Sequence, residues 1–109
     1  MTEQEVKSDA ADIVTILEGQ AGEVAGLLKA LAHPARLLLA GALVQDEYAV
    51  GELEERLGIH QPSLSQQLGV LRSAGIVGTR REAKQVFYRL TEERAALLIE
   101  ALTAIFPPE

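Results

Sequence analysis

The sequence has 109 residues, no cysteine and a formal net charge of −6. A chain of this length forms a single domain, and self-association would help so small a domain to bury apolar surface. The lack of cysteine excludes disulfides, thiolate metal ligands and thiol redox chemistry. No apolar run is long enough to span a membrane, and the acidic N-terminus lacks the layout of a secretory signal. We therefore expect a soluble, cytoplasmic protein.

The N-terminal part of the chain is predicted to be helical after a short disordered start. Residues 1–7 are polar and are expected to be disordered. One helix is expected to begin at about residue 8, and a second to cover residues 21–31. Gly19 and Gly22 are expected to separate the two helices, but one long helix that bends at these glycines is an alternative that the sequence leaves open.

A further helix is predicted to begin after His33. Pro34 suits the first position of a helix because its missing N–H would have no partner there. This helix is expected to run to about Val44, and we interpret His33 as a residue that caps or supports it rather than as a ligand. The polar residues 45–48 are predicted to form a connector.

Two helices with a glycine between them follow the connector. Val50–Leu57 is predicted to be helical, and Gly58 can adopt the positive φ that ends a helix. The stretch His60–Gly75 contains a second helix whose leucines recur at helical spacing (Leu64, Leu68 and Leu71). A helix, a tight glycine turn and a second helix form the helix-turn-helix pattern, in which the second helix reads the DNA major groove.

The exposed face of this second helix has amides, hydroxyls and small residues but no acid. Such side chains can exchange hydrogen bonds with base edges. Gln61, Ser65 and Gln66 are predicted to contact bases, with Ser63 and Gln67 nearby.

A net positive charge is confined to this region and the segment after it. Residues 60–90 carry a net charge of +4 and the remaining residues −10. Two β-rich runs in 76–90 surround a polar tip and predict a basic hairpin. Such a hairpin after a recognition helix is the wing of a winged helix. Arg72, Arg80, Arg81 and Lys84 are predicted to contact phosphates.

A last helix is expected to have Thr91 as its N-cap and to end before Pro107. Its apolar side chains form a broader surface than a three-helix core requires (Leu97, Leu98, Ala101, Leu102, Ile105 and Phe106). The N-terminal helices have a similar excess. We therefore predict a twofold dimer through the N- and C-terminal helices; the alternative is that these faces pack together in a monomer.

The segment 57–90 and the His-Pro-x-Arg-Leu motif within 32–37 resemble the ArsR family of bacterial winged-helix regulators. The resemblance covers about residues 20–106. It implies a mainly α fold with a small β-hairpin, a winged helix-turn-helix that dimerises through its N- and C-terminal helices. It also implies a DNA-binding and dimerisation domain over 8–106 with a tail at 107–109, and a homodimer that binds an inverted-repeat operator in double-stranded DNA.

Two residues depart from the family's pattern in the DNA-binding region. His60 stands where the family usually has a serine that caps the recognition helix. Ala83 stands where the family has a glycine at the wing tip. Either the turn type differs, or Ala83 adds strain of about 1 kcal/mol.

The family's usual sensing groups are also missing. Its thiolate motif would fall at Gly51–Arg56, which has no cysteine, and residues 91–106 have no histidine. The sequence looks closer to the persulfide- and redox-sensing branch, whose two cysteines would fall at Gly41 and Pro107. This protein therefore cannot sense persulfide through sulfur, and neither a metal nor a cofactor is expected.

The leading hypothesis is a sequence-specific, homodimeric transcriptional repressor related to persulfide-responsive repressors. One alternative is a winged-helix module that binds a protein partner. Another is a repressor that responds to a small ligand or to haem through His33 or His60. An enzyme is not expected, because Ser63 and Ser65 lack a nearby His–Asp pair and no Gly-rich phosphate loop is present.

Overall fold

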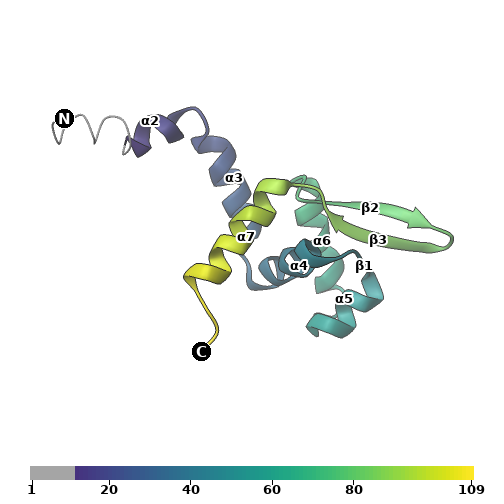
Figure 1. Ribbon diagram of the computed structural model, residues 1–109. Coiled ribbons are helices and arrows are strands. Elements are labelled where there is room, and N and C mark those ends of the chain that lie inside the picture. The colour runs from purple at the N-terminus through teal and green to yellow at the C-terminus, as the bar shows by residue number, and fades with distance from the viewer. Residues whose placement is uncertain (1–11) are drawn as a thin grey trace.

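The computed structural model describes residues 12–109, and Figure 1 shows how their helices and strands are arranged. The elements in chain order are α2 (Ile13–Glu18), α3 (Ala21–Leu31), α4 (Pro34–Gln45), β1 (Tyr48–Ala49), α5 (Val50–Leu57), α6 (Ser63–Ser73), β2 (Val77–Glu82), β3 (Gln85–Leu90) and α7 (Glu93–Ile105). The predicted class, a mainly helical winged helix-turn-helix, is confirmed.

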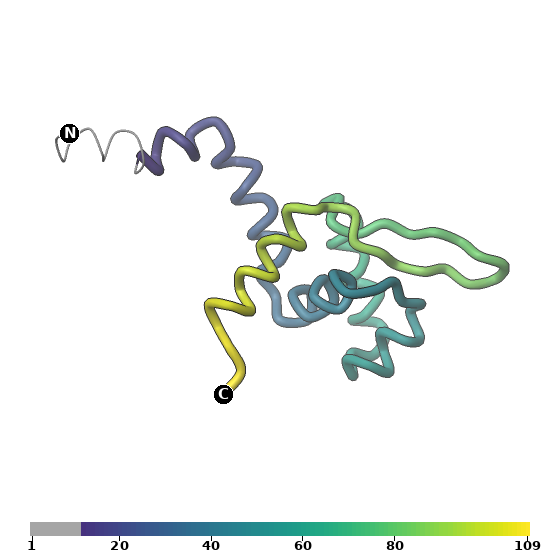
Figure 2. Tube along the Cα trace, viewed as in Figure 1, coloured from purple at the N-terminus to yellow at the C-terminus, as the bar shows by residue number. Residues whose placement is uncertain are grey.

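The N-terminal segment forms two helices, which settles the alternative that the sequence left open. A turn at Gly19 and Gln20 separates α2 from α3. The carboxylate of Asp12 caps α2, because its Oδ1 accepts a hydrogen bond from the Thr15 N–H at 3.1 Å. The predicted helix start at residue 8 and the predicted disorder of residues 1–7 lie outside the described residues. Helix α2 buries none of its side chains, and in Figure 2 it leads away from the other helices.

The core is built around α4, which packs against α3, α5, α6 and α7. Its Leu39 is fully buried, and His33 caps its start as expected: Nδ1 accepts a hydrogen bond from the Ala35 N–H at 3.0 Å. The leucine stripe of α6 also faces this core, which confirms the helical spacing read from the sequence. The largest fully buried side chains are Leu39, Leu53, Leu64, Leu68, Leu71 and Ile76.

The sheet has three antiparallel strands in the order β1-β3-β2, one more than the predicted hairpin. Tyr48 pairs with Tyr88, and Ala49 with Phe87. Residues 45–48 were predicted to form only a connector, and this prediction was wrong for Tyr48, which belongs to β1. A strand of two residues has no period that a sequence pattern could reveal, so β1 depends on its pairing with β3. The pairing fixes the start of α5 against the hairpin.

The N-cap of α7 is Glu92 and not Thr91, so that prediction was wrong. Thr91 continues the extended chain after β3, where its N–H donates to the Ile76 carbonyl at 2.8 Å and its hydroxyl to the Gly75 carbonyl at 3.2 Å. The Glu92 carboxylate accepts from the Arg94 N–H at 3.0 Å. Hydrogen bonds from the Arg94 side chain and then its N–H lower the pKa of Glu92 to about 2.

The hairpin tip contains Ala83 at φ 55°, so the strain expected at this position is present. We expect Ala83→Gly to raise the free energy of unfolding by roughly 0.5–1 kcal/mol. Glycine adopts positive φ without the Cβ clash but adds entropy to the unfolded chain. Urea unfolding followed by circular dichroism measures the change. Ala25→Gly, within α3, should have the opposite effect, and equal destabilisation by both variants would contradict the strain at Ala83.

Within residues 12–109, no single helix has the length and apolar composition of a membrane span. Helices α3 and α4 satisfy these criteria only when joined, and they are bent by 100° at their junction.

Candidate nucleic-acid interface

The helix-turn-helix consists of α5, the Gly58 turn and α6, as the sequence predicted. The Glu52 carboxylate fixes the start of α5 by accepting from the Ala49 N–H at 2.8 Å. Gly58 ends it with φ 68°, the left-handed conformation that favours glycine. We call α6 the recognition helix, and the β2–β3 hairpin, residues 77–90, the wing.

The start of the recognition helix uses the side chain of Gln61. Its Oε1 accepts a hydrogen bond from the Ser65 N–H at 3.0 Å. The His60 ring is highly exposed instead, with Nδ1 at 3.3 Å from a carboxylate oxygen of Glu54. The N-cap residue is Pro62, so Gln61 takes the part that the family resemblance gave to the position of His60, and its amide N–H groups stay available for a base.

The three predicted base-reading residues and the two predicted to lie nearby do not share one environment. Ser65 and Gln66 are fully on the exposed face, with Val70 beside them, and Ser63 is half-buried at the first turn. Gln67 is half-buried, and its Oε1 accepts a hydrogen bond from Arg36 Nη1 at 2.9 Å. The amide of Gln67 thus faces α4, and the freely exposed part of the helix centres on Ser65 and Gln66.

Arg36 positions the recognition helix, a role that the sequence did not reveal. Besides its bond to Gln67, its Nε donates to the Ala30 carbonyl at 2.6 Å and its Nη2 to the Lys29 carbonyl at 3.4 Å. One guanidinium therefore joins the end of α3, the start of α4 and the middle of α6. The only available signal was that Arg36 belongs to the His-Pro-x-Arg-Leu motif.

Arg80 is exposed but already paired with acidic side chains of the protein. Its Nε donates to Glu47 and its Nη1 to Glu82 at 2.7 Å, and its guanidinium lies 4.6 Å from the centre of the Phe87 ring. The hydrogen bonds to Glu82 and then Glu47 raise the pKa of Arg80. Glu47 comes from the turn after α4, so this contact between distant residues also fastens the wing to the helical body.

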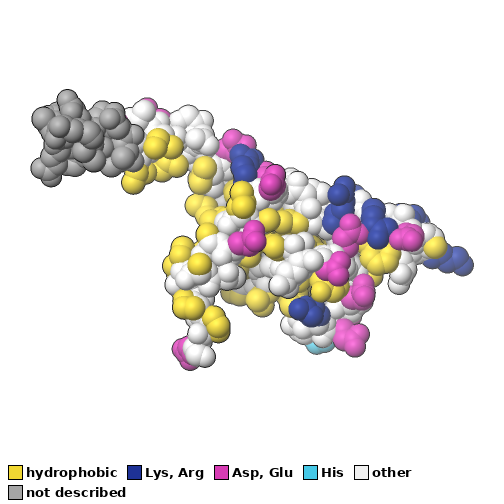
Figure 3. All heavy atoms as spheres, viewed as in Figure 1, with side chains coloured by type: hydrophobic (Ala, Val, Ile, Leu, Met, Phe, Trp, Pro, Cys, Tyr) yellow, Lys and Arg dark blue, Asp and Glu magenta, His cyan; other side chains and the backbone are white. Residues whose placement is uncertain are grey.

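The other three predicted phosphate-binding residues are free. Arg72, Arg81 and Lys84 are exposed and have no hydrogen-bond or ion-pair partner among residues 12–109. Figure 3 shows Lys and Arg side chains along the wing and at its tip, with Asp and Glu side chains beside them. The free members of the predicted phosphate-binding set therefore lie at the end of α6 and at the wing tip.

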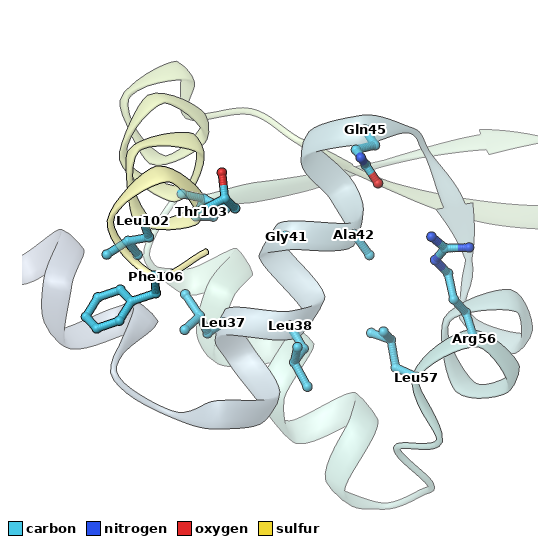
Figure 4. Close-up of a pocket in the computed structure, with 11 residues that line it drawn as sticks. Leu37, Leu38, Gly41, Ala42, Gln45, Arg56, Leu57, Leu102, Thr103 and Phe106 are labelled. Carbon is cyan, nitrogen blue, oxygen red and sulfur yellow. The ribbon is translucent and has the colours of Figure 1, made fainter. Parts of the chain in front are cut away.

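A mainly apolar cavity of about 510 Å³ lies between α4, α5 and α7, away from the recognition helix. Gly41 and Phe106 line it (Figure 4), and Pro107 follows Phe106 in the sequence. A Cβ placed on Gly41 would have no atom within 4 Å. Among the described residues, no group of three or more acidic or histidine side chains could hold a metal ion.

Comparison with known proteins identifies the family of this chain and its regulatory role. The profile of "Bacterial regulatory protein, arsR family" matches residues 33–79. A biofilm growth-associated repressor of Agrobacterium fabrum is 71% identical over 90 residues, which are 83% of this chain and 77% of that protein. The chain belongs to the ArsR family. This ArsR-family protein is therefore a transcriptional regulator and not an enzyme.

Solved structures agree with this assignment. The transcriptional repressor BigR of Xylella fastidiosa has a TM-score of 0.82 and 53% identity, over 100% of both chains. The homodimeric winged helix-turn-helix DNA-binding domain Mb0332 of Mycobacterium bovis has a TM-score of 0.70 and 29% identity, over 89% of this chain and 88% of that one. The ArsR-family regulator thus shares its fold with a repressor and with a homodimeric DNA-binding domain.

Proposed function

We propose that this regulator is a homodimeric repressor that inserts α6 into the major groove of an inverted-repeat operator. The observation that carries the proposal is the acid-free exposed face of α6, together with the free cations at the end of that helix and at the wing tip. Amides and hydroxyls on such a face can read base edges, while the flanking cations bind phosphates and fix the register.

In this proposal Ser65 and Gln66 read bases directly. Gln61 contributes through its amide N–H groups, since its oxygen is bonded to the helix. Ser63 and Gln67 lie close enough to the interface to support the contact, and Gln67 also anchors α6 to Arg36. Arg72, Arg81 and Lys84 bind phosphates, and Arg80 does so only after leaving its internal partners.

The dimer uses the apolar side chains that the single chain leaves in water. On α2, Ile13 and Ile16 are 63% and 59% exposed; on α7, Leu97 and Ile105 are 61% and 66% exposed. Exposed patches of this kind mark interaction sites. A twofold dimer would hold two copies of α6 about 34 Å apart, which matches successive major grooves and hence an inverted repeat. The functional domain in this proposal covers residues 8–106, with 107–109 as a tail.

The signal that releases the repressor is proposed not to be sulfur-based. Gly41 and Pro107 stand where the resemblance to the persulfide- and redox-sensing branch would place its two cysteines, and neither can form a persulfide or a disulfide. The regulator would thus be a thiol-free relative of those repressors.

The DNA-binding face is tested with two variants. Gln66→Ala should lose about 1–3 kcal/mol of discrimination between the operator and random DNA. Arg81→Ala should weaken binding to all sequences alike and reduce the salt slope by about 1. Fluorescence anisotropy over a salt series measures both effects, with DNA from upstream of the protein's own gene and with random DNA.

Gln20→Ala and Lys29→Ala remove an amide and a cation outside α6 and the wing, and both should bind like the unmodified protein. Equal affinity of the unmodified protein for both DNAs, with almost no salt dependence, would contradict the proposal and favour the protein-interaction module.

A further inference from the structure

We propose that the cavity between α4, α5 and α7 binds a small amphipathic carboxylate, a molecule with an apolar body and one carboxylate group. The inference that a ligand binds here depends only on the cavity and its lining. Its effect on transcription rests on the function proposed above, because the ligand would act as the regulatory signal.

The cavity has the size and lining of a small-molecule site. Its volume of about 510 Å³ lies within the range of roughly 300–1,000 Å³ that is usual for such sites. Leu37, Leu102 and Phe106 form its apolar end in Figure 4, and Gly41 lies in the wall beside them. Because Gly41 has no side chain, the α4 wall stays open at its centre. An apolar body of several carbons would cover aliphatic surface that otherwise contacts water.

The opposite end of the cavity is polar. Gln45 and Arg56 line it, away from Phe106 (Figure 4). The Arg56 guanidinium lies 5.7 Å from the centre of the Tyr48 ring and has no hydrogen-bond or ion-pair partner among residues 12–109. A carboxylate can accept two hydrogen bonds from a guanidinium, and Gln45 can donate another. The charge of Arg56 therefore selects an anionic head group, and the rest of the lining selects an apolar body.

The site spans the parts of the molecule that a signal must connect. Arg56 and Leu57 belong to α5, the first helix of the helix-turn-helix, and Leu57 directly precedes the Gly58 turn. Leu102 and Phe106 belong to the end of the chain that carries the proposed dimer surface. A ligand that touches both sides would bias the angle between the dimer helices and the recognition helix, and so change operator affinity.

Isothermal titration of the full chain with octanoate and octanamide tests the site. These probes share an apolar chain and differ in charge. Octanoate should bind more tightly than octanamide by roughly tenfold, and Arg56→Gln should remove this difference. Gly41→Leu should abolish binding of both, because its side chain fills the cavity. Gly41→Leu also replaces a glycine in a helix interior by a residue that favours the helix, so the melting temperature of this variant should not fall. Gly41→Ala, which adds one methyl group, should still bind octanoate.

Three results would overturn the proposal. The first is no heat of binding for octanoate, and the second is equal binding of octanoate to the unmodified protein and to Gly41→Leu. The third is that Gly41→Leu weakens self-association and octanoate dissociates the dimer, which would mean that a second copy of the chain covers the cavity. Operator binding without ligand is measured separately and should be retained by Gly41→Leu. If no variant binds the operator, the proposed function fails, and the octanoate titration still decides the site.

Discussion

Leu97→Glu should make the protein monomeric and lower its affinity for a palindromic operator by roughly 100-fold or more. Leu97 is 61% exposed and lies four residues before Ala101 and eight before Ile105, so the three share one stripe of α7. In a twofold dimer the new carboxylate would be desolvated in both copies at once. Each recognition helix would then bind its half-site without the local concentration that the partner provides.

Sedimentation velocity gives the mass of the variant, and anisotropy gives its operator affinity. Glu100→Gln also changes the charge of α7 by one unit, but it adds no charge to the stripe and should remain dimeric. A Leu97→Glu protein that stays dimeric and binds the operator normally would show that this face of α7 is not the interface.

Arg36→Met should lower the free energy of unfolding by about 2–3 kcal/mol. Methionine keeps much of the aliphatic stem but removes the donors that reach the Ala30 carbonyl and the Gln67 amide. These acceptors are partly buried, and they would lose their partner without an equivalent replacement. For a domain of this size the melting temperature should fall by roughly 10–20 °C.

Thermal unfolding is compared at one protein concentration, because a dimer's stability depends on concentration. Arg36→Lys should not restore stability, since a single ammonium cannot reproduce the fork that joins α3 to α6. Arg89→Met is the matched control: Arg89 is exposed and has no polar partner in the described part of the chain, so its loss should matter little. An equal loss of stability in both methionine variants would rule out the bridging role.

The sequence predicted the elements whose signals are local. The α6 leucines recur at helical spacing, Gly58 supplies a positive φ, and Pro34 marks the start of α4. Each signal acts within a turn or two of the chain, so no tertiary partner is needed to interpret it. The outward face of α6 follows from the same spacing, which is why Ser65 and Gln66 could be placed on it before the fold was known.

Contacts between distant parts of the chain could not be predicted in this way. Gln67 looks like a base-reading residue on a helical wheel, but Arg36, 31 positions earlier, turns it toward α4. Arg80 looks free until Glu47, 33 positions earlier, is brought beside it. The cavity is also a product of packing, because its lining comes from three helices. Sequence spacing shows which residues share a face, and only the packing of helices shows which faces meet.

Because of its placement, Arg80 in the wing has carboxylate counterions within the protein itself. Glu47 and Glu82 already neutralise this guanidinium, so a phosphate can bind it only by displacing a carboxylate. Such an exchange breaks one ion pair for each one that it forms, so its net gain in free energy is small. Arg80 would therefore add little to loose, sequence-independent contact with DNA. It would contribute only once the wing is docked closely enough for the phosphate to replace the acids, which favours the fully seated complex over sliding encounters.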